Sequence, residues 1–295
     1  MFLRYVLSLK ASYETMAERS LIHEKSIVDI QPTRGWVKLR LGELWEYRDL
    51  LYFLVWRDLK VRYKQTVLGI LWVILQPLLT MGVFTVFLGY LAKVPSDGIP
   101  YPVFVFCALL PWQLFAHALA ESGNSLVANQ QLIKKVYFPR LIIPICSVIV
   151  GLVDFGVAFI VLMGMMFLYG IVPSYAILTL PLFLVLAILA ALSVSLWLSA
   201  LNALYRDVRH SIPFLIQFWL FATPIAYSSS LVPEQFRPLY GLNPMVGVIE
   251  GFRWALLGKG HVGSLIFISA LVVILLFLGG LVYFRQMEKT FADVI

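Results

Sequence analysis

The sequence predicts an all-α integral membrane protein with six transmembrane helices, an N-terminal amphipathic interfacial helix and short external re-entrant helices between spans 5 and 6. Hydrophobic residues make up 61% of the 295 residues and charged residues only 13%, and the mean hydropathy is +0.87. A soluble domain carries about 25% charged residues. Here the charge is concentrated in the first 64 positions, and long apolar segments follow. The composition therefore indicates a polytopic membrane protein.

The first 40 residues are polar and of mixed charge, and no apolar run among them resembles a secretory signal. We expect a cytosolic N-terminal tail here. Met16 is an alternative start position, so the true first residue stays open.

Residues 41–64 are predicted to form one amphipathic helix, because apolar and charged side chains separate onto opposite faces at about 100° per residue. The apolar face contains Leu41, Leu44, Trp45, Leu51, Tyr52, Val55, Trp56, Leu59 and Tyr63, and the charged face contains Glu43, Glu46, Asp49, Arg57, Lys60 and Lys64. The unbroken apolar run of residues 50–56 is far shorter than the ~20 residues that span a bilayer. A helix lying among lipid head groups fits this pattern, and a helix packed on a soluble domain is the alternative.

Six apolar segments predict membrane spans near residues 66–91, 102–120, 141–170, 177–204, 212–228 and 263–284. The fifth is short and contains Pro213 and Pro224. Nineteen Lys and Arg residues lie on the side that holds both termini, against four on the other side. The excess of cations marks the cytosolic side, so both termini are predicted to be cytosolic. The six-span domain covers residues 65–285, and residues 286–295 form a C-terminal tail.

Two connections have helical character. Residues 121–140 carry a hydrophobic edge and the Lys134-Lys135 pair, which suits a groove on a cytosolic partner, although a helix resting on lipid head groups is the alternative. In the external segment 229–262, the apolar stretch after Asn243-Pro244 is too short to cross the membrane. It is predicted to be re-entrant or interfacial, with Glu250 and Arg253 pairing on one helical face.

Catalytic chemistry has little support in the sequence, and we predict no catalytic, cofactor-binding or metal-binding residue. There is no GxxxxGK[ST] phosphate loop, no HExxH, no GxSxG and no acidic pair of the kind that holds a nucleotide-sugar metal. Asp154 is the only carboxylate deep in an apolar segment. It is either a functional group or a partner in helix–helix hydrogen bonds, and both readings stay open. A proton- or sodium-driven carrier would be expected to have more such groups, arranged in a relay, so we expect any energy for transport to come from another polypeptide.

Five ordered motifs resemble a known family: WRDLKVRYKQTVLGILWVILQPLL, NQQLIKKVYFPRLIIP, LNALYRDVRH, TPIAY and LNPM. They look like the permease subunit of the type-2 ATP-binding-cassette polysaccharide exporters, the O-antigen, capsule and teichoic-acid group. The resemblance covers roughly residues 35–288. It implies a homodimer paired with two copies of a separate ATPase subunit, which would hold the ATP and Mg, so that this chain binds no cofactor.

The resemblance further implies a location in the bacterial inner membrane, among membrane lipids, and no nucleic-acid partner. The substrate would be a lipid-linked glycan, exported from the cytosolic to the outer side. A drug- or lipid-exporting type-2 permease, a membrane-embedded glycosyltransferase or acyltransferase, and a non-catalytic scaffold are the competing readings. The glycan and its lipid anchor stay open.

The resemblance places an ATPase-coupling helix near residues 129–139. The residues expected to dock on the ATPase are Asn129, Gln131, Leu132, Lys134, Lys135, Tyr137 and Phe138.

A cytosolic entrance for the anionic head group is expected where the basic cluster meets the first span. Its residues are Arg57, Lys60, Arg62 and Lys64, followed by the Leu68-Gly69 turn. Arginine gives bidentate phosphate contacts, whereas setting topology and binding anionic lipid is the alternative role of these cations.

Aromatic rings and one amide of the first and fifth spans are expected to line the translocation path, since rings give broad contact area to sugars. These residues are Trp72, Gln76, Phe84, Phe87, Phe214, Phe218, Phe221 and Tyr227. Packing or a lipid-facing belt is the alternative for the rings, while an amide within a span requires a partner or a watery channel.

Overall fold

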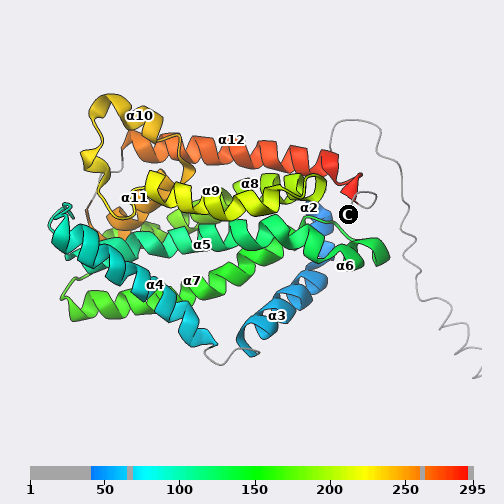
Figure 1. Ribbon diagram of the computed structural model, residues 1–295, viewed down its shortest axis with the longest axis horizontal. Helices are drawn as coiled ribbons and strands as arrows, with labels where there is room; N and C mark the ends of the chain where they lie inside the picture. The colour runs from blue at the N-terminus through cyan, green and yellow to red at the C-terminus, as the bar shows by residue number, and fades with distance from the viewer. Residues whose placement is uncertain (1–40, 65–68, 260–262, 292–295) are drawn as a thin grey trace, which may run out of the picture. The chain divides into compact units, whose positions relative to one another are not determined.

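The computed structural model describes residues 41–64, 69–259 and 263–291, and its regular elements in these ranges are all helical (Figure 1). The predicted N-terminal tail, Leu68 and the last four residues lie outside the described ranges. The all-α class predicted from composition is confirmed for the described part of the chain.

Five helical segments among the described residues are long and apolar enough to cross a membrane. They are α4 with the π-helix η1 (Ile70–Phe84 and Thr85–Leu91), α5 (Tyr101–Ala128), α7 (Ile142–Leu168), the 3₁₀ turn η2 with α8 (Tyr175–Thr179 and Leu180–Leu204), and α12 (Ser264–Met287). The fifth predicted span, residues 212–228, corresponds to α9 (Val208–Ala222), which has only 15 residues. A span needs about 20, so the helix alone does not meet that length.

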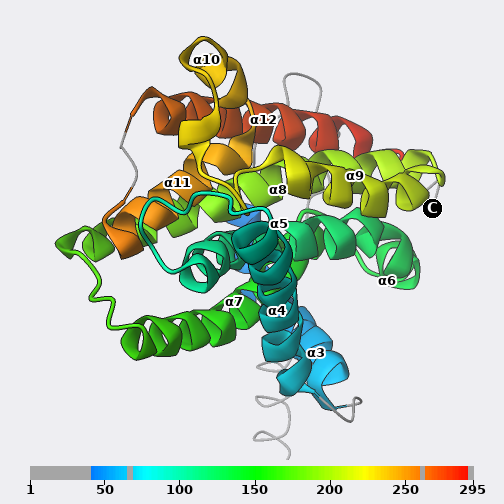
Figure 2. The same cartoon turned by 60° about the vertical axis from the view of Figure 1, so that its left-hand side comes forward.

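Helix α5 lies at the centre of the packing and contacts α4, α7, α8, α9 and α11 (Figures 1 and 2). Its large side chains fill the core, among them Phe104, Phe106, Leu109, Leu110 and Phe115. The segment formed by α4 and η1 is about as apolar, yet only 6% of the residues in its most apolar stretch are buried. Most of the surface of α4 is therefore left for lipid or for another chain.

Helix α9 ends at Ala222 because Thr223 adopts an extended conformation ahead of Pro224. Residues 223–227 then run without a helical hydrogen-bond ladder. Two side chains from later in the chain supply donors: the Asn243 amide donates to the Ala222 carbonyl at 3.1 Å, and Arg253 Nη2 donates to the Ile225 carbonyl at 2.9 Å. Carbonyl groups on both sides of Pro224 therefore accept hydrogen bonds from side chains outside the segment.

The external segment contains η3 (Ser229–Leu231), η4 (Glu234–Phe236), α10 (Arg237–Tyr240) and α11 (Pro244–Leu257). Helix α11 begins with a proline at its first position and an N-cap at Asn243, whose side chain accepts from the Met245 amide. It ends at Gly258, whose φ of 63° lies in the left-handed region. Nearly all of α11 is buried against α5, α8 and α12.

The predicted single interfacial helix is two helices, α2 (Leu41–Glu46) and α3 (Arg48–Lys64), separated by a turn at Tyr47. The predicted apolar face is also divided. Leu51, Val55 and Leu59 are partly buried, and Leu54 is fully buried on the side toward α7. The aromatic rings of that face, Trp45, Tyr52 and Trp56, are exposed. The aliphatic residues and Tyr63, whose hydroxyl donates to Asp154, therefore face the protein, whereas these three rings face outward.

The predicted hairpin helix is shorter than expected. Helix α5 continues to Ala128, and α6 covers only Gln130–Lys135, because Val136 is extended and Pro139 follows.

Candidate functional site: a cavity beside α4, α5 and α7

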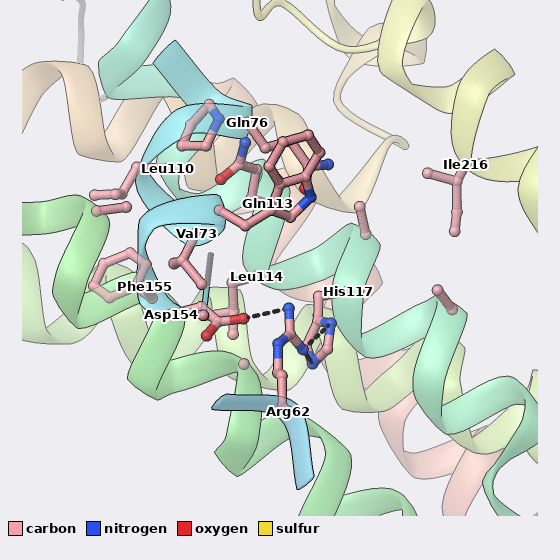
Figure 3. Close-up of a pocket in the computed structure, with 17 residues that line it drawn as sticks. Arg62, Val73, Gln76, Leu110, Gln113, Leu114, His117, Asp154, Phe155 and Ile216 are labelled. Atoms are coloured by element: carbon pink, nitrogen blue, oxygen red, sulfur yellow. Dashed lines mark hydrogen bonds and ion pairs between the residues drawn. The ribbon is translucent and has the colours of Figure 1, made fainter. Parts of the chain in front are cut away.

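A cavity of about 770 Å³ lies among the end of α3, α4, α5 and α7, with Ile216 of α9 also on its wall (Figure 3). Its walls are mostly apolar. The polar side chains that face it are Arg62, Trp72, Gln76, Gln113, His117 and Asp154. Figure 3 shows Gln76 and Gln113 toward one end of the cavity, with Arg62, His117 and Asp154 toward the other.

The charged end is a hydrogen-bonded cluster that joins three helices. Arg62 Nη2 of α3 lies 2.8 Å from Asp154 Oδ2 of α7, and Arg62 Nη1 lies 3.1 Å from each ring nitrogen of His117 in α5. The Tyr63 hydroxyl donates to the other oxygen of Asp154. Burial raises the pKa of Tyr63 well above its usual range, and the hydrogen bond to Asp154 adds to the rise. Asp154 therefore ties α3 to α7, which favours the hydrogen-bonding reading of this residue.

The other end of the cavity presents two side-chain amides. Gln76 lies next to Pro77 on α4, and Gln113 lies on α5. Neither amide forms a hydrogen bond with any other residue in the described part of the chain. Gln76 is exposed and Gln113 is partly buried, and apolar side chains flank both on their helices, so these amides are open to hydrogen-bonding partners in the cavity.

The four predicted head-group cations do not share one environment. Arg57 turns toward the α5–α6 junction, where Nη2 donates to Asn129 Oδ1 at 3.0 Å, while Nε donates to Asp58 at 2.8 Å. Lys60 and Lys64 are exposed, and Arg62 lies in the cavity.

The turn that follows the basic cluster also contributes a residue to the wall of the cavity. Gly69 lines the cavity with a positive φ of 42°, which a glycine adopts readily. Its predicted neighbour Leu68 lies outside the described residues.

The predicted coupling residues divide between an exposed and a buried set. Gln131, Lys134, Lys135 and Tyr137 are exposed, and Leu132 is half-buried. Asn129 is held by Arg57 and donates to the Ser125 carbonyl. Phe138 is buried, so it anchors the segment on the core together with Ile133 rather than facing outward.

The segment after α6 is braced by the C-terminal end of α12. The Arg140 amide donates to Glu288 Oε1 at 3.0 Å, and the Arg140 guanidinium donates to the Glu288 carbonyl. Arg285 pairs with the same carboxylate at 2.8 Å. No local sequence pattern predicted this contact, because its partners are distant in the chain.

The predicted path-lining residues also separate. Trp72 and Gln76 line the cavity, and Phe84 is half-buried against the core. The rings of Phe87, Phe214, Phe218 and Phe221 are exposed, while Tyr227 is half-buried with its hydroxyl 2.9 Å from that of Tyr240.

Gln113 and His117 were not among the predicted site residues. They lie four positions apart in a long apolar segment, so they share one face of α5. Two polar side chains at this spacing in an apolar segment could have indicated a polar site on this face of α5. Within the described ranges, no group of three His, Cys, Asp or Glu side chains could hold a metal ion.

Comparison with known proteins adds independent information. Residues 49–257 match the model of a family described as ABC-2 type transporter. The O-antigen export system permease protein RfbA of Klebsiella pneumoniae is 33% identical over 260 residues, which cover 88% of this chain and 98% of that protein. RfbA of Myxococcus xanthus is 32% identical over 214 residues, covering 72% of this chain and 81% of that protein. The polysialic acid transport protein KpsM of Escherichia coli is 26% identical over 241 residues, covering 79% and 91%.

Proposed function

Because the chain belongs to the ABC-2 type transporter family, we propose that it is the permease subunit of an ATP-driven exporter that moves a lipid-linked polysaccharide out across the plasma membrane. The observation that carries the proposal is the 33% identity to an O-antigen export permease over 98% of that protein's length. The glycan belongs to the O-antigen, capsule or teichoic-acid class. The several long apolar helices make the chain a multi-pass membrane protein.

Six spans are proposed, with both termini cytosolic, in the inner membrane of a bacterium. In this topology α9 and the non-helical residues 223–227 cross together as the fifth span. The donors that Asn243 and Arg253 supply to the Ala222 and Ile225 carbonyls support the assignment, since unsatisfied carbonyl groups are costly within a bilayer. Helices α10 and α11 then form the external re-entrant segment, and α2 and α3 the interfacial region.

ATP hydrolysis is assigned to a separate subunit, because membership of the family implies pairing with an ATPase. The exposed side of α6, with Lys134, Lys135 and the following Tyr137, is the proposed docking surface. Burial of Ile133 and Phe138 supports this role, because these two side chains anchor α6 and the residues after it on the hydrophobic core. A push from the ATPase on α6 would reach α3 through the bond between Arg57 and Asn129.

The complex is proposed to contain two copies of this chain and two ATPase subunits. The apolar but largely exposed surface of α4 and the exposed rings of Phe214, Phe218 and Phe221 on α9 support a path between the two copies. Lys60 and Lys64, which are exposed, are proposed to attract the anionic head group of the substrate. Long-range electrostatic attraction does not require a fixed side-chain geometry.

The test is transport by the full chain with its partner ATPase in lipid vesicles. Lipid-linked glycan is placed in the outer leaflet, and movement is followed by protection of the glycan from an added glycosidase. We expect ATP-dependent protection in the vesicles whose ATPase faces outward. ATP-dependent movement of short lipids or drugs, without movement of the glycan, would contradict the proposal.

A further inference from the structure

We propose that the cavity beside α4, α5 and α7 binds neutral pyranose sugars of the glycan, and that Gln76 and Gln113 recognise their hydroxyl groups. The inference rests on the proposed function, because it concerns which part of the exported molecule this cavity selects. It assigns the cavity to the sugar rather than to the pyrophosphate of the same substrate.

The charge of the cavity favours a neutral ligand. Its cation, Arg62, is paired at 2.8 Å with its carboxylate, Asp154, so the two formal charges cancel. The other cations at the end of α3, Lys60 and Lys64, are exposed and do not line the cavity. A phosphate in this space would meet the Asp154 carboxylate, and juxtaposed like charges disfavour such a ligand.

The two amides favour a ligand that both donates and accepts hydrogen bonds. Each glutamine side chain offers one acceptor oxygen and two donor hydrogens. In the described part of the chain neither amide is engaged by protein, and apolar side chains flank both along the chain. A lipid tail would leave them unpaired, whereas the hydroxyl groups of a sugar satisfy both kinds of group.

The remaining walls fit the apolar faces of a pyranose ring. The indole of Trp72 in α4 lines the cavity and is half exposed, and the ring of Phe155 in α7 also lines it. Aromatic rings give broad, flat contact area to such faces. The volume of about 770 Å³ falls within the range of about 300–1,000 Å³ that is usual for small-molecule sites.

The experiment compares two probes on the full chain with its partner ATPase in vesicles. One probe is polyprenyl pyrophosphate without sugar, and the other is the same lipid carrying the first disaccharide of the glycan. The readout is the concentration of each lipid that half-maximally stimulates ATP hydrolysis. We expect the wild type to respond to the disaccharide lipid at a concentration about ten-fold lower, the size expected from two added hydrogen bonds.

The variant Gln76→Leu with Gln113→Leu is expected to lose this ten-fold preference. The control Gln286→Leu is expected to keep it, because Gln286 is exposed on α12 and does not line the cavity. Co-purification with the ATPase and the basal rate of ATP hydrolysis report whether the double variant is folded.

A second variant separates sugar from phosphate and does not depend on the double variant folding. Gln113→Glu keeps the shape and an acceptor for hydroxyl groups, so we expect the preference for the disaccharide lipid to stay within about twofold of wild type. A phosphate site would instead lose response to both lipids, because the new carboxylate repels the anion.

The outcomes separate the two proposals. Equal half-maximal concentrations for the two lipids in the wild type, or an equal loss for both lipids in either variant, would overturn the sugar site while leaving the exporter function in place. A wild-type complex that neither transports nor responds to any lipid-linked glycan would overturn the proposed function itself.

Discussion

Arg62 at the end of α3 and Asp154 in the middle of α7 form an ion pair of 2.8 Å at the floor of the cavity. Together with the bond from Arg57 to Asn129, this pair attaches α3 to the helical core at two places. An interfacial helix held only by lipid would need neither contact. The position of α3 is therefore set by the protein, and the rings of Trp45, Tyr52 and Trp56 are left exposed on the outside.

Replacing Asp154 by Asn should destabilise the protein by about 1–2 kcal/mol, because the guanidinium of Arg62 loses its charged partner but is partly exposed to solvent. The measurement is the thermal unfolding midpoint of the detergent-purified protein. Asp49→Asn is the matched control, since Asp49 is almost fully exposed in its 3.8 Å pair with Arg48. Equal shifts of the unfolding midpoint for the two variants would show that the Arg62–Asp154 pair adds no more stability than an exposed ion pair.

Neutralising Lys60 and Lys64 to Gln should reduce glycan export several-fold without lowering the unfolding midpoint, because both side chains are exposed and make no protein contact that carries stability. Adding Arg62→Gln should abolish export and also lower the midpoint, since that residue holds Asp154. Dimer assembly should survive in both variants. Normal export after removal of all three cations would contradict a role in substrate attraction and would indicate that they only set the membrane topology.

Charge reversal at Lys134 and Lys135 should uncouple ATP hydrolysis from export. Both side chains are exposed on α6, so the change leaves the buried anchors Ile133 and Phe138 untouched. The measurements are co-purification with the ATPase, ATP turnover and transport in vesicles. Lys259→Glu, an exposed position after α11, is the control and should behave as wild type. An unchanged complex with unchanged transport would indicate that α6 rests on lipid head groups.

Much of the fold follows from local sequence signals. Long apolar runs predicted the membrane helices, and the Asn243-Pro244 and Gly258 positions carry the cap chemistry that bounds α11. Pro224 likewise explains the end of α9. These features depend on neighbours in the chain, so a pattern of residue types is sufficient to find them.

The site was less predictable because its contacts join distant segments. Helical periodicity placed Arg57 on the charged face of its helix, but its side chain reaches Asn129, 72 positions away. The role of Asp154 was open until Arg62 and Tyr63 were found beside it. Gln113 became a site residue only because α4 and α5 border one cavity. Periodicity reports which side of a helix is apolar but not which helix faces it.

Close packing of α11 gives a prediction at Gly251. A Cβ at this position would collide with the ring of Phe183, so Gly251→Ala should destabilise the protein by about 1–3 kcal/mol. At Gly156 in α7 a Cβ meets nothing within 4 Å, and Ala there should be neutral or stabilising by about 0.5–1 kcal/mol. Thermal unfolding of the two variants side by side gives the comparison. A Gly251→Ala protein as stable as Gly156→Ala would mean that α11 can shift away from α8.

Arg253 should contribute strongly to the stability of the protein, because it is buried and has several partners. It is 3% exposed, pairs with Glu250 at 3.5 Å, lies 3.7 Å from the centroid of the Phe104 ring and donates to the carbonyls of Ile225 and Tyr227. Arg253→Met should cost about 3–5 kcal/mol, because it leaves a buried carboxylate unpaired and two carbonyls without this donor.

The chain offers a matched control for Arg253 in the same external segment. Arg237 pairs with Glu234 at the same distance of 3.5 Å and the same i, i+3 spacing, but Glu234 is 90% exposed. Arg237→Met should therefore change stability by no more than about 0.5 kcal/mol. If the unpaired carboxylate causes most of the loss, adding Glu250→Gln to Arg253→Met should recover part of it. No recovery would assign the loss to the Ile225 and Tyr227 carbonyls in the non-helical segment after α9, to which Arg253 donates.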